Sequence, residues 1–179
     1  MNPPMPTFAP AQTGEQVPSD PIATSQNAAP QVAQTRFGPL PVSGHQVWLS
    51  ASPLPGFEGL QRYALIVVEK QQPFLWLQSL DDAAVSFLLA PAAHFGLRYA
   101  RLDAASVPMV MVLLPGQPAQ PLRAHGQAPL VFDAQAGQFE QHIVEADEVE
   151  GDGAFVPQAA AALPADLLQR LLVLTPVGA

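Results

Sequence analysis

The sequence predicts a mainly β protein, in which antiparallel strands form a small closed or partly open β-barrel-like domain with a short C-terminal α-helix. Three observations carry this prediction. Short runs rich in Val, Leu and Phe follow one another and are separated by Pro or Gly. No helical pattern lies between them, which argues against parallel strands joined by crossover helices. The only clear helical periodicity occurs near the C-terminus.

The residues before the first apolar run form a separate segment. Residues 1–34 are rich in Pro, Ala, Gln, Ser and Thr and poor in large apolar groups. Such a segment buries too little surface to offset the entropy lost on ordering, so we expect a disordered leader. The alternative is a short linear motif for a partner around Phe8. The barrel domain then spans 35–145, and residues 146–179 form an acidic linker and an amphipathic helix.

Seven runs are predicted to be strands. They are Val47–Leu49, Tyr63–Val68, Phe74–Leu80, Val85–Ala90, Val107–Leu114, Pro129–Phe132 and Phe139–Val144. The short connection 69–73 predicts a hairpin of the second and third strands. A further hairpin turn is expected at 133–138, where Gly137 is free to take a positive φ.

The run P-F-L-W-L-Q-S, residues 73–79, is apolar on both faces of a strand and then admits a glutamine. This pattern is expected where one face is buried in a curled sheet and the other is covered by a neighbouring segment. Gln78 then lies at the end of a buried row, and its amide requires hydrogen-bond partners. We expect these partners to be backbone groups of the adjoining turn 54–58.

The terminal helix is predicted over about 164–174. Pro164 suits a first-turn position, and Asp166 suits the positive end of the helix dipole. Leucines recur with helical spacing from Leu163 to Leu174. A helix of this length is marginal alone, so it docks either against its own barrel or against a partner or second copy.

Composition limits the classes of function. The chain contains no cysteine, which excludes disulfides and thiol chemistry and favours a reducing compartment. Its net charge of −8, from 7 basic and 15 acidic residues, argues against direct binding of nucleic acid. No apolar run has the length of a membrane span, and no signal peptide is recognisable. We expect a soluble, cytoplasmic protein.

No catalytic residue, metal site or cofactor is predicted. The four histidines are far apart in sequence, which favours surface or rim positions over a metal site, and no serine lies in a nucleophile motif. Asp81 and Asp82 follow a strand, where aspartate is a common turn residue. The acidic run 145–153 lacks the calcium-loop pattern and is expected to be a solvated, flexible link.

Several of these stretches resemble the flagellar assembly factor FliW family. They are T-R-F-G-P-L (35–40), L-P-G-F-E-G-L-Q-R-Y-A-L (54–65) and P-F-L-W-L-Q-S-L-D-D (73–82), with a looser match at Q-A-P-L-V-F-D (127–133). The residues that carry the resemblance in order and spacing, and that we assign structural roles, are Phe37, Gly38, Pro55, Gly56, Phe57, Glu58, Phe74, Leu77, Gln78, Ser79, Ala128 and Pro129. The sequence departs from the family after the fourth strand, where an aromatic cluster is thinned and an acidic helix is missing from 97–108.

The resemblance implies a non-enzymatic protein-binding role in flagellum biogenesis. Family members bind flagellin in the cytoplasm and antagonise the RNA-binding translational regulator CsrA, which couples flagellin synthesis to filament assembly. Two alternatives to this role remain open. The missing helix motivates the first, a FliW-like barrel that has lost CsrA binding and acts only as a flagellin-binding chaperone. The second is a barrel that binds a small ligand.

The run M-V-M-V-L-L, 109–114, is the candidate binding strand. Met109, Met111 and Leu113 share one face of an ideal strand, and the intervening residues share the other. Both faces cannot be solvated. Methionine fills gaps in cores and also adapts to partner surfaces, so core packing and a partner-facing role both remain open.

Deleting residues 1–34 is predicted to leave the melting temperature nearly unchanged, because a disordered leader contributes no packing. A fall of more than a few degrees in thermal unfolding followed by circular dichroism would show that the leader is packed.

Overall fold

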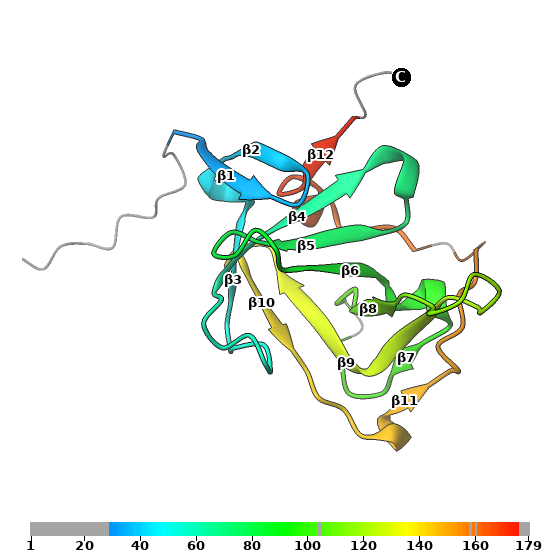
Figure 1. Cartoon of the computed structure of the whole chain (residues 1–179). Helices are drawn as coiled ribbons and strands as arrows, with labels where there is room; N and C mark the ends of the chain where they lie inside the picture. Colours follow the sequence, from blue (N-terminus) through cyan, green and yellow to red (C-terminus); the bar gives the residue numbers. More distant parts are fainter. Residues whose placement is uncertain (1–28, 104, 158, 160, 176–179) are drawn as a thin grey trace, which may run out of the picture.

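Seven strands close into a β-barrel in the structure, a computed structural model that describes residues 29–103, 105–157, 159 and 161–175. The hydrogen-bonded order is β4-β3-β10-β9-β8-β6-β5, and β5 pairs back with β4 to close the barrel (Figure 1). The barrel strands are β3 (Val47–Ser50), β4 (Arg62–Val68), β5 (Leu75–Ser79), β6 (Ser86–Pro91), β8 (Met109–Leu113), β9 (Arg123–Asp133) and β10 (Gln138–Gln141). The predicted mainly β barrel is therefore confirmed.

The other elements lie outside the barrel wall. A two-stranded hairpin, β1 with β2, and strand β12 lie at one end in Figure 1, and β7 with β11 lies at the opposite end. Their bounds are β1 (Gln31–Thr35), β2 (Gly38–Val42), β7 (Arg98–Tyr99), β11 (Val149–Glu150), α1 (Ala165–Leu168) and β12 (Leu172–Leu174). Single turns of 3-10 helix occupy Gly44–Gln46, Glu69–Gln71, Ala92–Phe95 and Ala146–Glu148.

All seven predicted barrel strands are present, with shifted ends. Strand β9 begins at Arg123, six positions before the expected Pro129. Residues 123–127 alternate exposed and half-buried positions and contain no apolar run, so the sequence pattern did not predict this part of the strand. Both predicted hairpins form: β4 pairs antiparallel with β5, and β9 with β10. Gly137 closes the second turn with a φ of +67°.

The first strand begins inside the segment assigned to the leader. Strand β1 starts at Gln31 and pairs along its whole length with β2. Residues 1–28, including Phe8, lie outside the described residues. A deletion ending at residue 34 removes most of β1, so the truncation that tests the leader alone ends at residue 28.

The main core fills the barrel with apolar side chains from every wall. Aromatic rings meet at its centre: Tyr63 contacts the Phe139 ring edge to face at 5.2 Å, and Trp48 contacts Phe132 at 5.1 Å. All of Trp48, Tyr63 and Phe139 are essentially inaccessible to solvent. Each such pair adds about 1 kcal/mol to the burial of its apolar area.

A second apolar cluster lies outside the barrel and organises the acidic segment. Phe95 and Leu97 pack with Val110 and the half-buried Phe155. Strand β11 pairs with β7, and Ala100 N–H donates to the Glu148 carbonyl oxygen at 3.1 Å. Most of 145–153 is exposed to solvent, and its backbone is paired with β7 at Val149 and Glu150.

The C-terminal segment differs most from its prediction. The helix has only one turn, Ala165–Leu168, and Leu172–Leu174 instead form a strand parallel to β4. Strand β4 pairs with β3 only through residues 62–64, so the backbone at 66–68 is free to accept β12. Leu167 and Leu171 are buried in the main core, so the segment docks against its own barrel.

Arg170 fastens this segment to the barrel. Its Nη1 donates to the Ala134 carbonyl oxygen at 3.0 Å, and its Nη2 donates to the Val47 carbonyl oxygen at 2.9 Å. The guanidinium lies 4.7 Å from the centre of the Trp48 ring. It also approaches Gly137 so closely that a Cβ at that position would collide with it.

Replacing Arg170 with alanine is expected to lower the free energy of unfolding by about 2 kcal/mol, because two charge-assisted hydrogen bonds and a cation–π contact are lost. Thermal unfolding would then shift down by roughly 4 to 8 °C. Gln169→Ala, at the exposed neighbouring position, is the control. Equal melting temperatures for the two variants would show that Arg170 is not a fastening residue.

Candidate protein-binding surface

The buried side chain of Gln78 connects strand β5 with the β1–β2 loop and the β5–β6 turn. Its side chain is fully buried, and its Oε1 accepts the backbone N–H of Arg36 at 3.1 Å. Its Nε2 donates to the carbonyl oxygens of Ser79, Ala83 and Val85 at 2.9, 3.3 and 3.1 Å. The predicted burial and backbone pairing of the amide are confirmed. The predicted partner was wrong: Gln78 binds the β1–β2 loop and the β5–β6 turn, and not the turn 54–58.

Asp81 and Asp82, which the sequence predicted to be turn residues, lie in the β5–β6 turn and help to fix it. The Ser79 hydroxyl accepts the N–H groups of Asp81 and Asp82 at 3.1 and 3.0 Å. The Asp81 carboxylate accepts the backbone N–H and the guanidinium Nε–H of Arg62, each at 2.8 Å. Burial raises the pKa of Asp81, but these hydrogen bonds and the Arg62 charge outweigh it and lower the pKa below its usual value. The aspartates therefore serve turn structure.

The turn 54–58 covers a different part of the barrel. Gly56 has a φ of +82°, which suits only glycine, and its N–H donates to the Glu58 carboxylate at 2.9 Å. Leu54 is buried in the main core. The Phe57 ring meets the Phe87 ring edge to face at 5.0 Å. The turn is thus fixed to strand β6 by its apolar side chains.

A hollow of about 280 Å³ lies between this turn and strands β6, β8, β9 and β10. We call it the turn groove; its lining residues are Leu54, Pro55, Phe57, Phe87, Met111, His125, Ala128, Gln141 and Ile143. Most of its lining is apolar, and the Ile143 side chain is 71% exposed. An open apolar groove with an exposed aliphatic side chain is typical of a surface that receives a protein partner.

The three candidate binding residues of β8 separate in the structure. Met109 is fully buried in the main core, Met111 is half-buried in the turn groove, and Leu113 is 49% exposed. The pairing of β8 with β9 shifts register between Met109 and Met111, so strict alternation fails there. Met111 and Leu113 remain candidates for contact with a partner, whereas Met109 serves the core.

The family-motif residues are spread over several parts of the barrel. Phe37 and Gly38 form the β1–β2 loop and the start of β2, and Phe74 packs on Phe155 beside the second cluster. Leu77, Ala128 and Pro129 are buried in strands β5 and β9. Only Pro55, Phe57 and Ala128 of the motif set line the turn groove. No sequence pattern singles out Ile143, because its exposure depends on β10 ending two residues before it.

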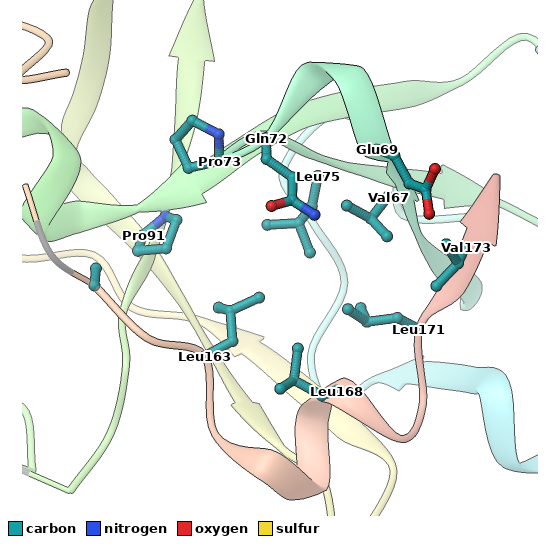
Figure 2. Close-up of a pocket in the computed structure, with 11 residues that line it drawn as sticks. Val67, Glu69, Gln72, Pro73, Leu75, Pro91, Leu163, Leu168, Leu171 and Val173 are labelled. Carbon is teal, nitrogen blue, oxygen red and sulfur yellow. The ribbon is translucent and has the colours of Figure 1, made fainter. Parts of the chain in front are cut away.

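A second groove of about 360 Å³ lies beside the C-terminal segment. Figure 2 shows Leu163, Leu168 and Leu171 of this segment facing the strand side chains Val67 and Leu75 across an open centre. We call it the C-terminal groove. None of the twelve residues assigned structural roles in the family motif lines it, and neither does any residue of β8 or β9.

Chemical groups suited to catalysis are scattered over the described residues. No group of His, Asp or Glu side chains there is placed to hold a metal ion. His94 is buried against Phe155, which corrects the expectation of surface or rim positions for every histidine, while His45 and His125 are exposed. In the part of the chain that is described, no helix is both long and apolar enough to span a bilayer.

Comparison with known proteins places this barrel in a family. The profile described as FliW protein matches residues 31–152. The chain belongs to the FliW family. A flagellar assembly factor FliW from Syntrophus aciditrophicus (strain SB) is 31% identical over 128 residues, covering 64% of this chain and 80% of that protein.

A second relative and a solved structure show the same similarity to FliW proteins. A FliW from Leptospira interrogans (serovar copenhageni) is 28% identical over 110 residues, covering 54% of this chain and 73% of that protein. A crystal structure of the flagellar assembly factor FliW superposes with a TM-score of 0.59 at 20% identity, over 71% of this chain and 97% of that chain. This similarity shows the shared fold. The family match ends at residue 152, before the C-terminal segment that carries Arg170 and β12.

Replacing Gln78 with leucine is expected to lower the free energy of unfolding by about 3 kcal/mol, because buried backbone groups lose their partners. Urea unfolding measures this change, and amide hydrogen exchange over 31–42 should accelerate more than exchange in β9. Gln138→Leu makes the same change at an exposed strand position. Unchanged stability of the Gln78 variant would contradict the assigned role of the buried amide.

Proposed function

We propose that this protein is a non-enzymatic flagellar assembly factor that binds flagellin in the cytoplasm through the turn groove and antagonises the regulator CsrA. The observation that carries the proposal is the turn groove itself. Motif residues of the FliW family and the half-buried Met111 line one open apolar hollow there. The relatives bear the name flagellar assembly factor, which supports a role in the same process.

The proposed cycle needs only competition between binding equilibria. While flagellin accumulates, it occupies the protein, and CsrA is free to repress translation. After flagellin is exported, the protein binds CsrA and flagellin synthesis resumes. A net charge of −8 suits this second partner, because proteins that bind RNA present basic surfaces to phosphate.

The second candidate is a flagellin-binding chaperone that no longer binds CsrA. One observation favours it: the described residues between β7 and β8 form no helix, where the resemblance implies an acidic one. Isothermal titration of the full chain with host flagellin and with host CsrA, in separate experiments, distinguishes the candidates. Binding of both supports the first, binding of flagellin alone selects the second, and binding of neither at micromolar concentration refutes both.

Replacing Ile143 with glutamate is expected to weaken flagellin binding at least about fivefold, because a charge replaces an exposed apolar contact in the turn groove. Leu168→Glu makes the matched change in the C-terminal groove, where the side chain is 50% exposed. Titration calorimetry compares the two. Greater loss of affinity with Leu168→Glu would move the binding surface to the C-terminal groove.

A further inference from the structure

Arg36 is an exposed cation that is held by several contacts, none of them to an acidic side chain. Arg62 and Arg101 form ion pairs with Asp81 and Glu148, at 2.8 and 2.7 Å. The Arg36 guanidinium, among the described residues, has no carboxylate within ion-pair distance. Exposed cations without a partner are common on protein surfaces, but such side chains ordinarily move freely. Arg36 is different because its position is fixed at both ends.

The backbone of Arg36 is fixed by the fully buried side chain of Gln78. Arg36 and Phe37 form the two-residue loop between β1 and β2. The Arg36 N–H donates to Gln78 Oε1, and the Thr35 hydroxyl accepts the Phe37 N–H at 3.1 Å. A loop tip, which is ordinarily mobile, is thus tied to the barrel wall.

The guanidinium of Arg36 is fixed by a different set of contacts. Its Nη1 donates to the Ser86 hydroxyl at 3.0 Å, and its Cζ lies 3.9 Å from the centre of the Trp76 ring. The Phe37 ring lies edge-on to Trp76 at 6.0 Å. Trp76 is itself oriented, because its Nε1 donates to Gln71 Oε1 at 2.9 Å. We call Arg36, Phe37 and Trp76 the Arg36 platform.

The platform has the chemical properties of a binding hot spot. A guanidinium carries five N–H donors, and Ser86 accepts from one of its nitrogens, so a planar pair of donors is available for a carboxylate. Phe37 and Trp76 are half-buried and keep apolar surface accessible. Arg and Trp dominate hot spots because they offer large contact area and, when held in advance, lose little entropy on binding.

We propose that the Arg36 platform binds a carboxylate side chain of a protein partner, next to an apolar side chain that packs on Trp76 and Phe37. This assignment rests on the proposed function, which has two partners, flagellin and the regulator. The positive charge of Arg36 decides which of the two supplies the carboxylate. An RNA-binding regulator presents cations, which Arg36 would repel, so the carboxylate belongs to flagellin. An RNA phosphate is disfavoured by the net charge of −8.

The test compares single replacements in the full chain by titration with host flagellin. Arg36→Ala should weaken binding by about tenfold, because the charge and its stacked surface are lost together. Arg36→Lys should recover part of this loss, because it keeps the charge but not the planar donor pair. Arg98→Ala, which removes another exposed charge, on β7, should stay within about twofold of the unmodified protein.

Raising the salt concentration supplies an independent readout. Flagellin binding by the unmodified protein should weaken with salt more steeply than binding by Arg36→Ala, because one ion pair is missing from the variant. Melting temperatures of the variants establish that they are folded. Equal affinities for Arg36→Ala and Arg98→Ala overturn the inference and leave the proposed function intact.

Two further outcomes overturn the partner assignment. If the unmodified protein does not bind flagellin, both the proposed function and the assignment of flagellin to the platform fail. If Arg36→Ala instead weakens binding of CsrA, or of a labelled 20-nucleotide RNA added as a probe, while flagellin binding is unchanged, the platform binds a different partner class.

Discussion

The amide of Gln78 is the constraint on which the rest of this structure depends. It joins the β1–β2 loop, the end of β5 and the β5–β6 turn through hydrogen bonds to backbone groups of all three. Because the side chain is fully buried, any unmade bond would cost about 1 to 3 kcal/mol. The loop and the turn must therefore take their observed positions together. Gln78 fixes the backbone of Arg36, while Ser86 and Trp76 hold its guanidinium.

Local patterns were sufficient to predict the barrel strands and the burial of Gln78, because both follow from apolar periodicity and from the cost of an unpaired amide. The partner of Gln78 was not predictable in the same way. Arg36 lies 42 positions away in sequence, and turn 54–58 is a nearer source of free backbone groups. The closure of the barrel brings Arg36, and not the turn 54–58, to the end of β5, and no local sequence pattern contains this information. The Arg36 platform was missed for the same reason.

The C-terminal segment shows how one leucine pattern fits two structures. Leu167 and Leu171 are spaced as on a helix and are both buried, yet the backbone changes to a strand directly after Leu171. The open backbone of β4 supplies the hydrogen bonds for this change, and no local propensity reveals it. On β8, the register shift after Met109 likewise placed one candidate binding residue in the core and left Met111 in the turn groove.

The central claim is that partner binding uses the face built from the turn groove and the motif strands and leaves the C-terminal segment free. Hydrogen–deuterium exchange of the full chain, measured with and without saturating host flagellin, tests this directly. The account predicts slower exchange in the turn 54–58, in β8, in residues 142–144 and in the β1–β2 loop of the Arg36 platform, with little change in 165–174. Protection confined to 165–174 and to the end of β4 would contradict it.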